Sequence, residues 1–133
     1  MYNMTAMTTV FVFFALMTKH WICDFGLQNF WQVSNKGTYG HIAGIIHASI
    51  QMTGTLVALS LTLPYSNVFL LIALVEGIFH YHIDWAKANL NTKWKLDSSN
   101  DHFWWLLGFD QWMHNLNYVA ILVWLMIAGE LIR

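Results

Sequence analysis

Three pairs of a histidine and an aspartate, each pair four residues apart, recur along the chain: His20 with Asp24, His80 with Asp84, and Asp110 with His114. Residues four apart share one face of an α-helix, so each pair presents an imidazole beside a carboxylate. Imidazole nitrogens suit Zn, Fe, Ni or Cu, and carboxylate oxygens also admit Mn and Mg. The spacing therefore indicates helices that contribute ligands to a metal ion.

A seventh candidate ligand, His47, lies in a segment rich in glycine and alanine, where small side chains let helices approach closely. The complete predicted ligand set is His20, Asp24, His47, His80, Asp84, Asp110 and His114. The side chains expected to orient these ligands or to contact a phosphate are Gln28, Gln51, Lys87 and Gln111. The predicted cofactor is a divalent transition metal, namely Zn, Mn or Fe. The set would suffice for two ions, or for one ion whose ligands are oriented by the other residues.

Other ionisable residues have simpler interpretations. A single Asp–His pair can satisfy itself by hydrogen bonding, and polar side chains hold membrane helices together by roughly 0.6 to 2 kcal/mol each. Only the recurrence of three pairs favours metal binding. Glu76 is as well explained by a helix contact, and Lys19 by snorkelling or by pairing with a carboxylate of another helix. His82 points away from the face of His80, and Cys23 is expected to be a small buried hydrophobe.

The composition indicates the environment of these helices. Hydrophobic residues make up 57% of the 133 residues and charged residues only 10%, whereas a soluble domain averages roughly 25% charged residues. Eight tryptophans suit a protein anchored at membrane interfaces. The net charge of −1 excludes a basic surface for nucleic acid. We expect an integral membrane protein with the lipid bilayer as its partner, able to form a homo-oligomer.

Polar stretches and one proline divide the chain into four apolar segments. They are expected to be helices at about 4–31, 41–63, 67–90 and 102–131. Each has roughly the 20 residues that cross a bilayer. The sequence thus predicts an all-α fold: a single domain over 1–133, a polytopic four-helix transmembrane bundle with an inward-facing His/Asp cluster in one half of the membrane. A soluble four-helix bundle is the alternative, but these helices lack long charged faces.

Lysines define the expected orientation. Four spans place both termini and Pro64 on one side, marked only by Arg133, and place Lys36, Lys87, Lys93 and Lys95 on the other. The positive-inside rule makes the lysine side cytoplasmic, so both termini are expected outside the inner membrane. Because alternate helices run in opposite directions, all seven predicted ligands then fall in the cytoplasmic half.

The order and flanks of these motifs resemble a family of small bacterial and phage membrane proteins catalogued as a domain of unknown function, number 3307. The resemblance extends from about residue 16 to residue 116. Its motifs are His20-x-x-x-Asp24-Phe25-x-Leu27-Gln28, Lys36, His47, His80-x-His82-Ile83-Asp84-x-x-Lys87 and Asp110-Gln111-x-x-His114. It implies a multi-helix membrane protein and no particular reaction. The repeated His-x-x-x-Asp pairs are also similar to membrane proteins named as metal-dependent hydrolases, a likeness of motif type only.

Three functions follow from these patterns. The first is a metal site near the cytoplasmic face, in a hydrolase acting on a lipid or a phosphate-containing substrate. The second is a proton or ion pathway, or an oligomeric effector or regulatory protein, in which the His/Asp pairs form a relay or a polar core. The third is a haem bundle using His47 with His114 or His82, although carboxylates beside each histidine suit a harder metal.

Overall fold

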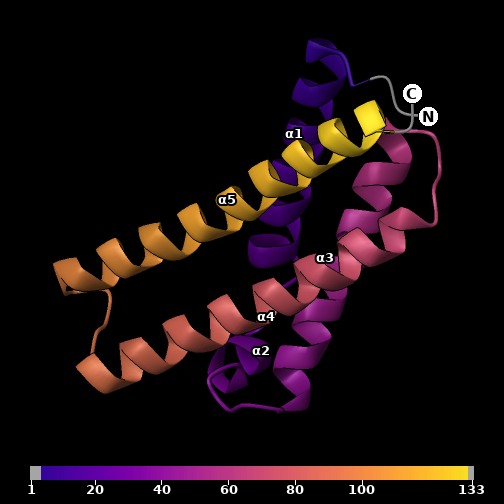
Figure 1. Cartoon of the computed structure of the whole chain (residues 1–133). Helices are drawn as coiled ribbons and strands as arrows, with labels where there is room; N and C mark the ends of the chain where they lie inside the picture. Colours follow the sequence, from indigo (N-terminus) through magenta and orange to yellow (C-terminus); the bar gives the residue numbers. More distant parts are fainter. Residues whose placement is uncertain (1–3, 132–133) are drawn as a thin grey trace.

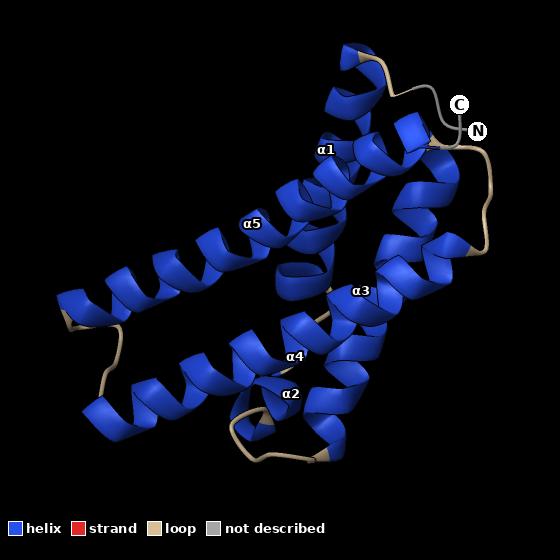
Figure 2. Cartoon of the chain, in the orientation of Figure 1, coloured by secondary structure: helices blue, strands red, loops and turns tan. Residues whose placement is uncertain are grey.

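A computed structural model describes residues 4–131 of the chain, with side chains described as far as residue 128, and this part is helical without any strand (Figure 2). The elements in order are α1 (Ala6–Trp21), the π-helical turn η1 (Ile22–Gly26), α2 (Phe30–Asn35), α3 (Ile42–Thr62), α4 (Val68–Trp94) and α5 (Asp101–Leu131). The all-α prediction is confirmed. Arg133, which was expected to mark one side of the membrane, lies outside the described residues.

The first predicted helix, 4–31, is divided into three elements. A π-helical turn ends α1, and the Leu27 N–H donates to the Ile22 carbonyl at 2.9 Å. A capping box between Asn29 and Gln32 then starts α2, because each side chain satisfies a free backbone N–H of the other residue. The prediction of one continuous helix is therefore wrong. π-Helical turns inside α-helices occur frequently at functional sites, and this one carries Asp24.

The remaining helix boundaries follow from local chemistry. His41 caps α3, because its Nδ1 accepts from the Ala43 N–H at 3.1 Å. That helix ends at Thr62, two residues before Pro64, where the chain cannot continue as a helix. Helix α4 continues to Trp94 and ends at Lys95, which adopts the left-handed conformation typical of helix termini. The predicted loop at 91–101 is accordingly shorter than expected.

Three helical segments of the described chain are long and apolar enough to cross a membrane: Ala6–Gly26, Ile42–Thr62 and Val68–Trp94. Helix α5 is not among them, so the prediction of four spans is corrected to three. The first half of α5 carries Asp110, His114 and other polar residues, and its uninterrupted apolar stretch, 118–128, is short for a ~30 Å hydrocarbon core at 1.5 Å per residue.

The long helices alternate in direction. Figure 1 shows the beginning of α1, the end of α5 and the α3–α4 connection toward one end of the molecule. The short α2 lies against the beginning of α3, and the α4–α5 connection projects away from the other helices. Helix α3 packs on α1 and α4, while α5 packs on α4 and α1. This arrangement brings the inward faces of all four long helices together.

Two kinds of side chain fill the interior. An apolar cluster comprises Val12, Leu16, Ala58, Leu59, Leu63, Phe69, Ile72, Tyr118, Ile121, Leu122 and Leu125. The rest of the buried interior is largely polar, and the outer surface carries many exposed apolar side chains, including Phe14 and Leu61. Large exposed apolar surfaces mark interaction with a membrane or a partner.

Candidate metal centre

Buried polar and charged side chains converge from every helical element, which is unusual because such residues are seldom fully buried. They are Lys19, His20, Asp24, Gln32, Lys36, His47, Gln51, Thr55, Glu76, His80, Asp84, Asp110 and His114. All seven predicted ligands are in this set. The structure thus brings together residues that are up to 94 positions apart in the sequence.

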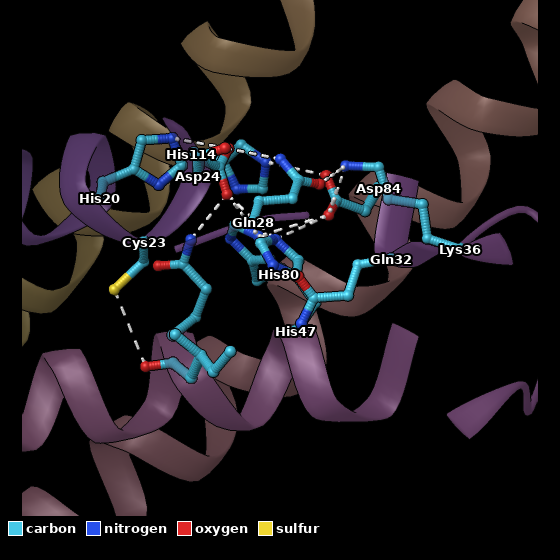
Figure 3. Close-up of polar contacts among 12 residues, drawn as sticks. His20, Cys23, Asp24, Gln28, Gln32, Lys36, His47, His80, Asp84 and His114 are labelled. Atoms are coloured by element: carbon cyan, nitrogen blue, oxygen red, sulfur yellow. Dashed lines mark hydrogen bonds and ion pairs between the residues drawn. The ribbon is translucent and has the colours of Figure 1, made fainter. Parts of the chain in front are cut away.

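Atoms of Asp24, His47 and His80 form a compact group, and Asp84 Oδ2 lies beside both imidazoles; we call these four residues site A (Figure 3). His47 Nε2 lies 3.0 Å from Asp24 Oδ1, 3.1 Å from His80 Nε2 and 3.2 Å from Asp84 Oδ2. His80 Nε2 lies 3.3 Å from Asp24 Oδ1 and 3.5 Å from Asp84 Oδ2. Ligands at about 2.0–2.2 Å around a tetrahedral zinc ion are about 3.4 Å apart, so these separations fit one ion.

A second group, site B, consists of Asp84, Asp110 and His114. His114 Nε2 lies 3.8 Å from Asp84 Oδ1 and 3.7 Å from Asp110 Oδ1. All three atoms are buried and have no hydrogen-bond partner among the described residues. Asp84 therefore takes part in both sites, through a different oxygen in each.

Comparison with known families decides the identity of the chain. A family model described as "Protein of unknown function (DUF3307)" matches residues 12–131. The protein belongs to this family. No curated protein and no solved structure matches the chain.

His20 occupies the edge of the centre in this DUF3307 chain. Its Nε2 lies 3.3 Å from Asp24 Oδ2 and 3.1 Å from Gln111 Oε1, and its Nδ1 lies 2.9 Å from the Tyr118 hydroxyl. A nitrogen of His20 also falls within 4.8 Å of ligand atoms of His80 and His114. The imidazole is thus within reach of both sites without belonging to site A.

The predicted orienting residues all lie beside the candidate ligands. Gln51 donates to Asp24 Oδ1 at 2.7 Å, and Gln111 donates to Asp110 Oδ2 at 3.1 Å. Lys87 Nζ lies 3.7 Å from that same Asp110 oxygen. Gln28 donates to the backbone carbonyl of Asp24 at 2.6 Å. The contacts of Gln51, Gln111 and Lys87 orient the carboxylates, whereas the Nδ1 atoms of His47 and His80 have no hydrogen-bond partner among the described residues.

One charged residue of the centre was not among the predicted ligands or orienting residues. Lys36 was placed in a polar loop, yet its Nζ donates to Asp84 Oδ2 at 3.0 Å and to Gln28 Oε1 at 2.8 Å. The capping box that starts α2 turns the chain so that Lys36 is buried at the end of this helix. No local spacing signals this contact, because Lys36 and Asp84 lie 48 residues apart and meet only through the packing of α2.

A second buried ion pair adjoins the centre. Lys19 Nζ lies 3.0 Å from Glu76 Oε1, so of the two interpretations of Lys19, snorkelling or pairing with a carboxylate of another helix, the structure shows the pairing. The hydroxyl of Thr55 donates to Glu76 Oε2 at 3.1 Å, and the hydroxyl of Tyr118 donates to Glu76 Oε1 at 3.4 Å. Thr55 and Tyr118 were not predicted, because isolated hydroxyls in apolar helices carry no recognisable spacing.

The lysines leave one negative charge unmatched. Three of the four buried carboxylates each lie within 4 Å of one lysine: Glu76 with Lys19, Asp84 with Lys36, and Asp110 with Lys87. Among the described residues, the ion pairs of Asp24 are with histidines only. With neutral imidazoles the centre carries a net negative charge, so the binding of a cation would relieve it.

Proposed function

We propose that this protein is an integral membrane protein that binds a divalent transition metal ion at site A. The observation that carries the proposal is the set of five separations between 3.0 and 3.5 Å among Asp24, His47, His80 and Asp84. Two imidazoles and two carboxylates suit Zn, Mn or Fe. Ca and Mg instead prefer sites made of oxygen ligands only.

Hydrogen bonding alone accounts poorly for this arrangement. His47 Nε2 faces three acceptor or nitrogen atoms within 3.2 Å, yet one imidazole nitrogen carries at most one proton and donates it once. His80 Nε2 faces the same two carboxylates, and it too can donate at most one proton. One cation among Asp24, His47 and His80, with Asp84 beside both imidazoles, would satisfy these atoms together, which supports metal binding over a network of hydrogen bonds.

The reaction class that we propose is metal-dependent hydrolysis of a lipid or a phosphate-containing substrate. A metal ion in a site with an open position polarises a carbonyl or phosphoryl oxygen and lowers the pKa of a bound water. Lys36 and Lys87, beside Asp84 and Asp110, would supply positive charge for an anionic headgroup. The closeness of these lysines to the candidate ligands supports an anionic substrate.

The test of metal binding compares two histidines of α4. His80→Ala removes a site A ligand, while His82→Ala removes an exposed histidine whose Nε2 is 3.2 Å from the Tyr39 hydroxyl. We expect purified wild-type protein and His82→Ala to retain a transition metal after dialysis, as measured by elemental mass spectrometry, and His80→Ala to lose it. Circular dichroism and gel filtration in detergent verify folding. Absence of metal after loading with Zn, Mn and Fe, or equal metal in both variants, would overturn the proposal.

One observation favours the proton or ion pathway as a second candidate. Buried contacts run from Glu76 to the Tyr118 hydroxyl at 3.4 Å, from there to His20 Nδ1 at 2.9 Å, and from His20 Nε2 to Asp24 at 3.3 Å. Chains of this kind relay protons in transporters. Proton flux into liposomes that disappears in Tyr118→Phe, in protein that binds no metal, would favour this function.

We further propose that the lysine-rich side faces the cytoplasm, with the beginning of α1 outside the inner membrane. Because α5 is not among the three candidate spans, the expectation that both termini lie outside is not carried over. The basis is the positive-inside rule applied to Lys36, Lys93 and Lys95. Single cysteines at Ser98 in the α4–α5 connection and at Ser66 in the α3–α4 connection, in a Cys23→Ala background, test the orientation. In intact cells an impermeant thiol reagent should label Ser66→Cys and spare Ser98→Cys. The opposite pattern would contradict it.

A further inference from the structure

Resting on the metal site proposed above, we infer that Asp84 bridges two metal ions, the second of which binds at site B. That ion would be held by Asp84 Oδ1, Asp110 Oδ1 and His114 Nε2. Site A offers Asp24, His47 and His80 together with the Asp84 oxygen that faces both imidazoles, whereas site B offers three ligands and so retains an open coordination position. The inference locates the position at which a substrate or water would meet the metal.

The three atoms of site B lack the partners that buried polar atoms normally have. Asp84, Asp110 and His114 are 2%, 3% and 1% exposed. None of the three atoms has a hydrogen-bond partner among the described residues, although most buried polar groups in proteins are paired. Leaving a buried polar group unsatisfied destabilises the fold, and more so when the group is charged. Three such atoms within 4.8 Å of one another form a group that one cation would satisfy together.

The Oδ2 atoms of Asp84 and Asp110 have partners, and this explains why the Oδ1 atoms of the same carboxylates are left to face site B. Asp110 Oδ2 accepts from Gln111 at 3.1 Å and lies 3.7 Å from Lys87 Nζ, which leaves Oδ1 directed toward His114. Asp84 Oδ2 accepts from Lys36 at 3.0 Å and faces site A, which leaves its Oδ1 for site B. Each carboxylate thus has one oxygen held by the protein's own cations and amides and one oxygen directed into site B.

The histidine rings place the two sites side by side. His80, a ligand of site A, stacks on His114, a ligand of site B, with ring centroids 4.1 Å apart and an interplanar angle of 28°. A bridging carboxylate with one oxygen on each ion is compatible with the spacing of about 3.5–4 Å found in two-metal sites. The sharing of Asp84 and the stacking of these rings both point to a dinuclear centre.

The inference is tested with manganese, because paired and isolated Mn²⁺ ions have different electron paramagnetic resonance spectra. Full-length protein in detergent is loaded with Mn²⁺, dialysed and analysed for metal content and spectrum. We expect two equivalents with the signal of an exchange-coupled pair in the wild type. His114→Ala should retain one equivalent with the six-line signal of an isolated ion. Asp84→Ala should retain neither ion.

The matched control is His102→Ala, an exposed histidine of the same helix α5, which should keep two equivalents and the coupled signal. If His114→Ala does not fold, Asp110→Asn, which preserves side-chain shape, takes its place with the same expected loss of one ion. One equivalent in the wild type that is lost in His80→Ala would overturn the second site and leave the proposed metal binding at site A intact. No bound Mn²⁺, Zn²⁺ or Fe²⁺ would overturn both.

Discussion

The polar and apolar halves of this bundle are built from the same helices and obey different requirements. In the apolar cluster, Leu16, Leu59 and Leu125 are fully buried and need only complementary shape. In the polar centre, atoms of Asp24, His47 and His80 lie 3.0–3.3 Å apart, and their mutual positions determine what they can bind. The apolar half thus stabilises the helices. The distances between ligand atoms in the polar half depend on how the apolar packing aligns these helices.

The Lys19–Glu76 pair lies at the boundary between these halves and predicts the largest loss of stability. Glu76→Leu would leave the buried ammonium of Lys19 without its carboxylate at 3.0 Å. Breaking a buried pair in this way costs about 3–5 kcal/mol. Thermal unfolding in detergent should show that loss, and the double variant Lys19→Met/Glu76→Leu should recover most of it. A single variant as stable as the wild type would show that the pair is not required at the boundary.

A substitution within the apolar half should destabilise the protein without changing its metal content. Leu59→Ala removes a fully buried side chain, and such truncations cost about 2–5 kcal/mol. The matched variant Leu61→Ala alters a leucine of the same helix that is 81% exposed, and its stability should stay within about 0.5 kcal/mol of the wild type. Unfolding curves and elemental analysis check both variants. Loss of metal from folded Leu59→Ala would break the proposed division between the halves.

A substitution beside site A should weaken metal binding and leave the protein folded, which is the opposite of the result expected for Leu59→Ala. Gln51 is fully buried, and its Nε2 holds Asp24 Oδ1 at 2.7 Å. Removing a residue that orients a metal ligand weakens affinity about 10–100-fold. Competition with a chelator should therefore measure that loss in Gln51→Leu. Thr53→Val, an exposed position of the same helix, should bind metal as the wild type does.

The smallest effect is expected outside both halves, in the α4–α5 connection. Asp97 is exposed, and hydrogen bonds from the Ser99 hydroxyl and backbone N–H lower its pKa below the usual value. Ser99→Ala removes one of these donors, so the pKa of Asp97 should rise toward that value, as NMR titration would show. Because the folded-state pKa is depressed, any stabilisation is present at neutral pH and is lost as the pH falls through the pKa. An unchanged titration would contradict this contact.

Local spacing predicted the helices and the residues that line their inner faces. The i,i+4 relation between His80 and Asp84 depends only on helix geometry, so it could be recognised before any packing was known. The predicted segments 41–63 and 67–90 correspond to α3 and α4 because Pro64 and its neighbours interrupt them. The error in the first segment arose at Ile22–Gly26, because no sequence rule distinguishes a π-helical turn from a continuing α-helix.

Contacts between helices could not be predicted in the same way. The bond from Lys36 to Asp84 depends on where α2 folds against α3, and the contact of Tyr118 with His20 depends on how α5 crosses α1. The division of Asp84 between two sites depends on side-chain rotation, which sequence spacing does not define. The expectation that α5 crosses the membrane was likewise wrong, because Asp110, His114 and other polar residues interrupt the apolar residues of its first half.

The most direct test of metal binding at site A is anomalous diffraction from crystals of the protein grown with zinc, measured on both sides of the zinc absorption edge. A metal ion at site A should give an anomalous difference peak about 2.0–2.2 Å from Asp24 Oδ1, His47 Nε2, His80 Nε2 and Asp84 Oδ2. Crystals of His82→Ala should show the same peak. No peak at this position, with the four side chains placed as described, would contradict the account.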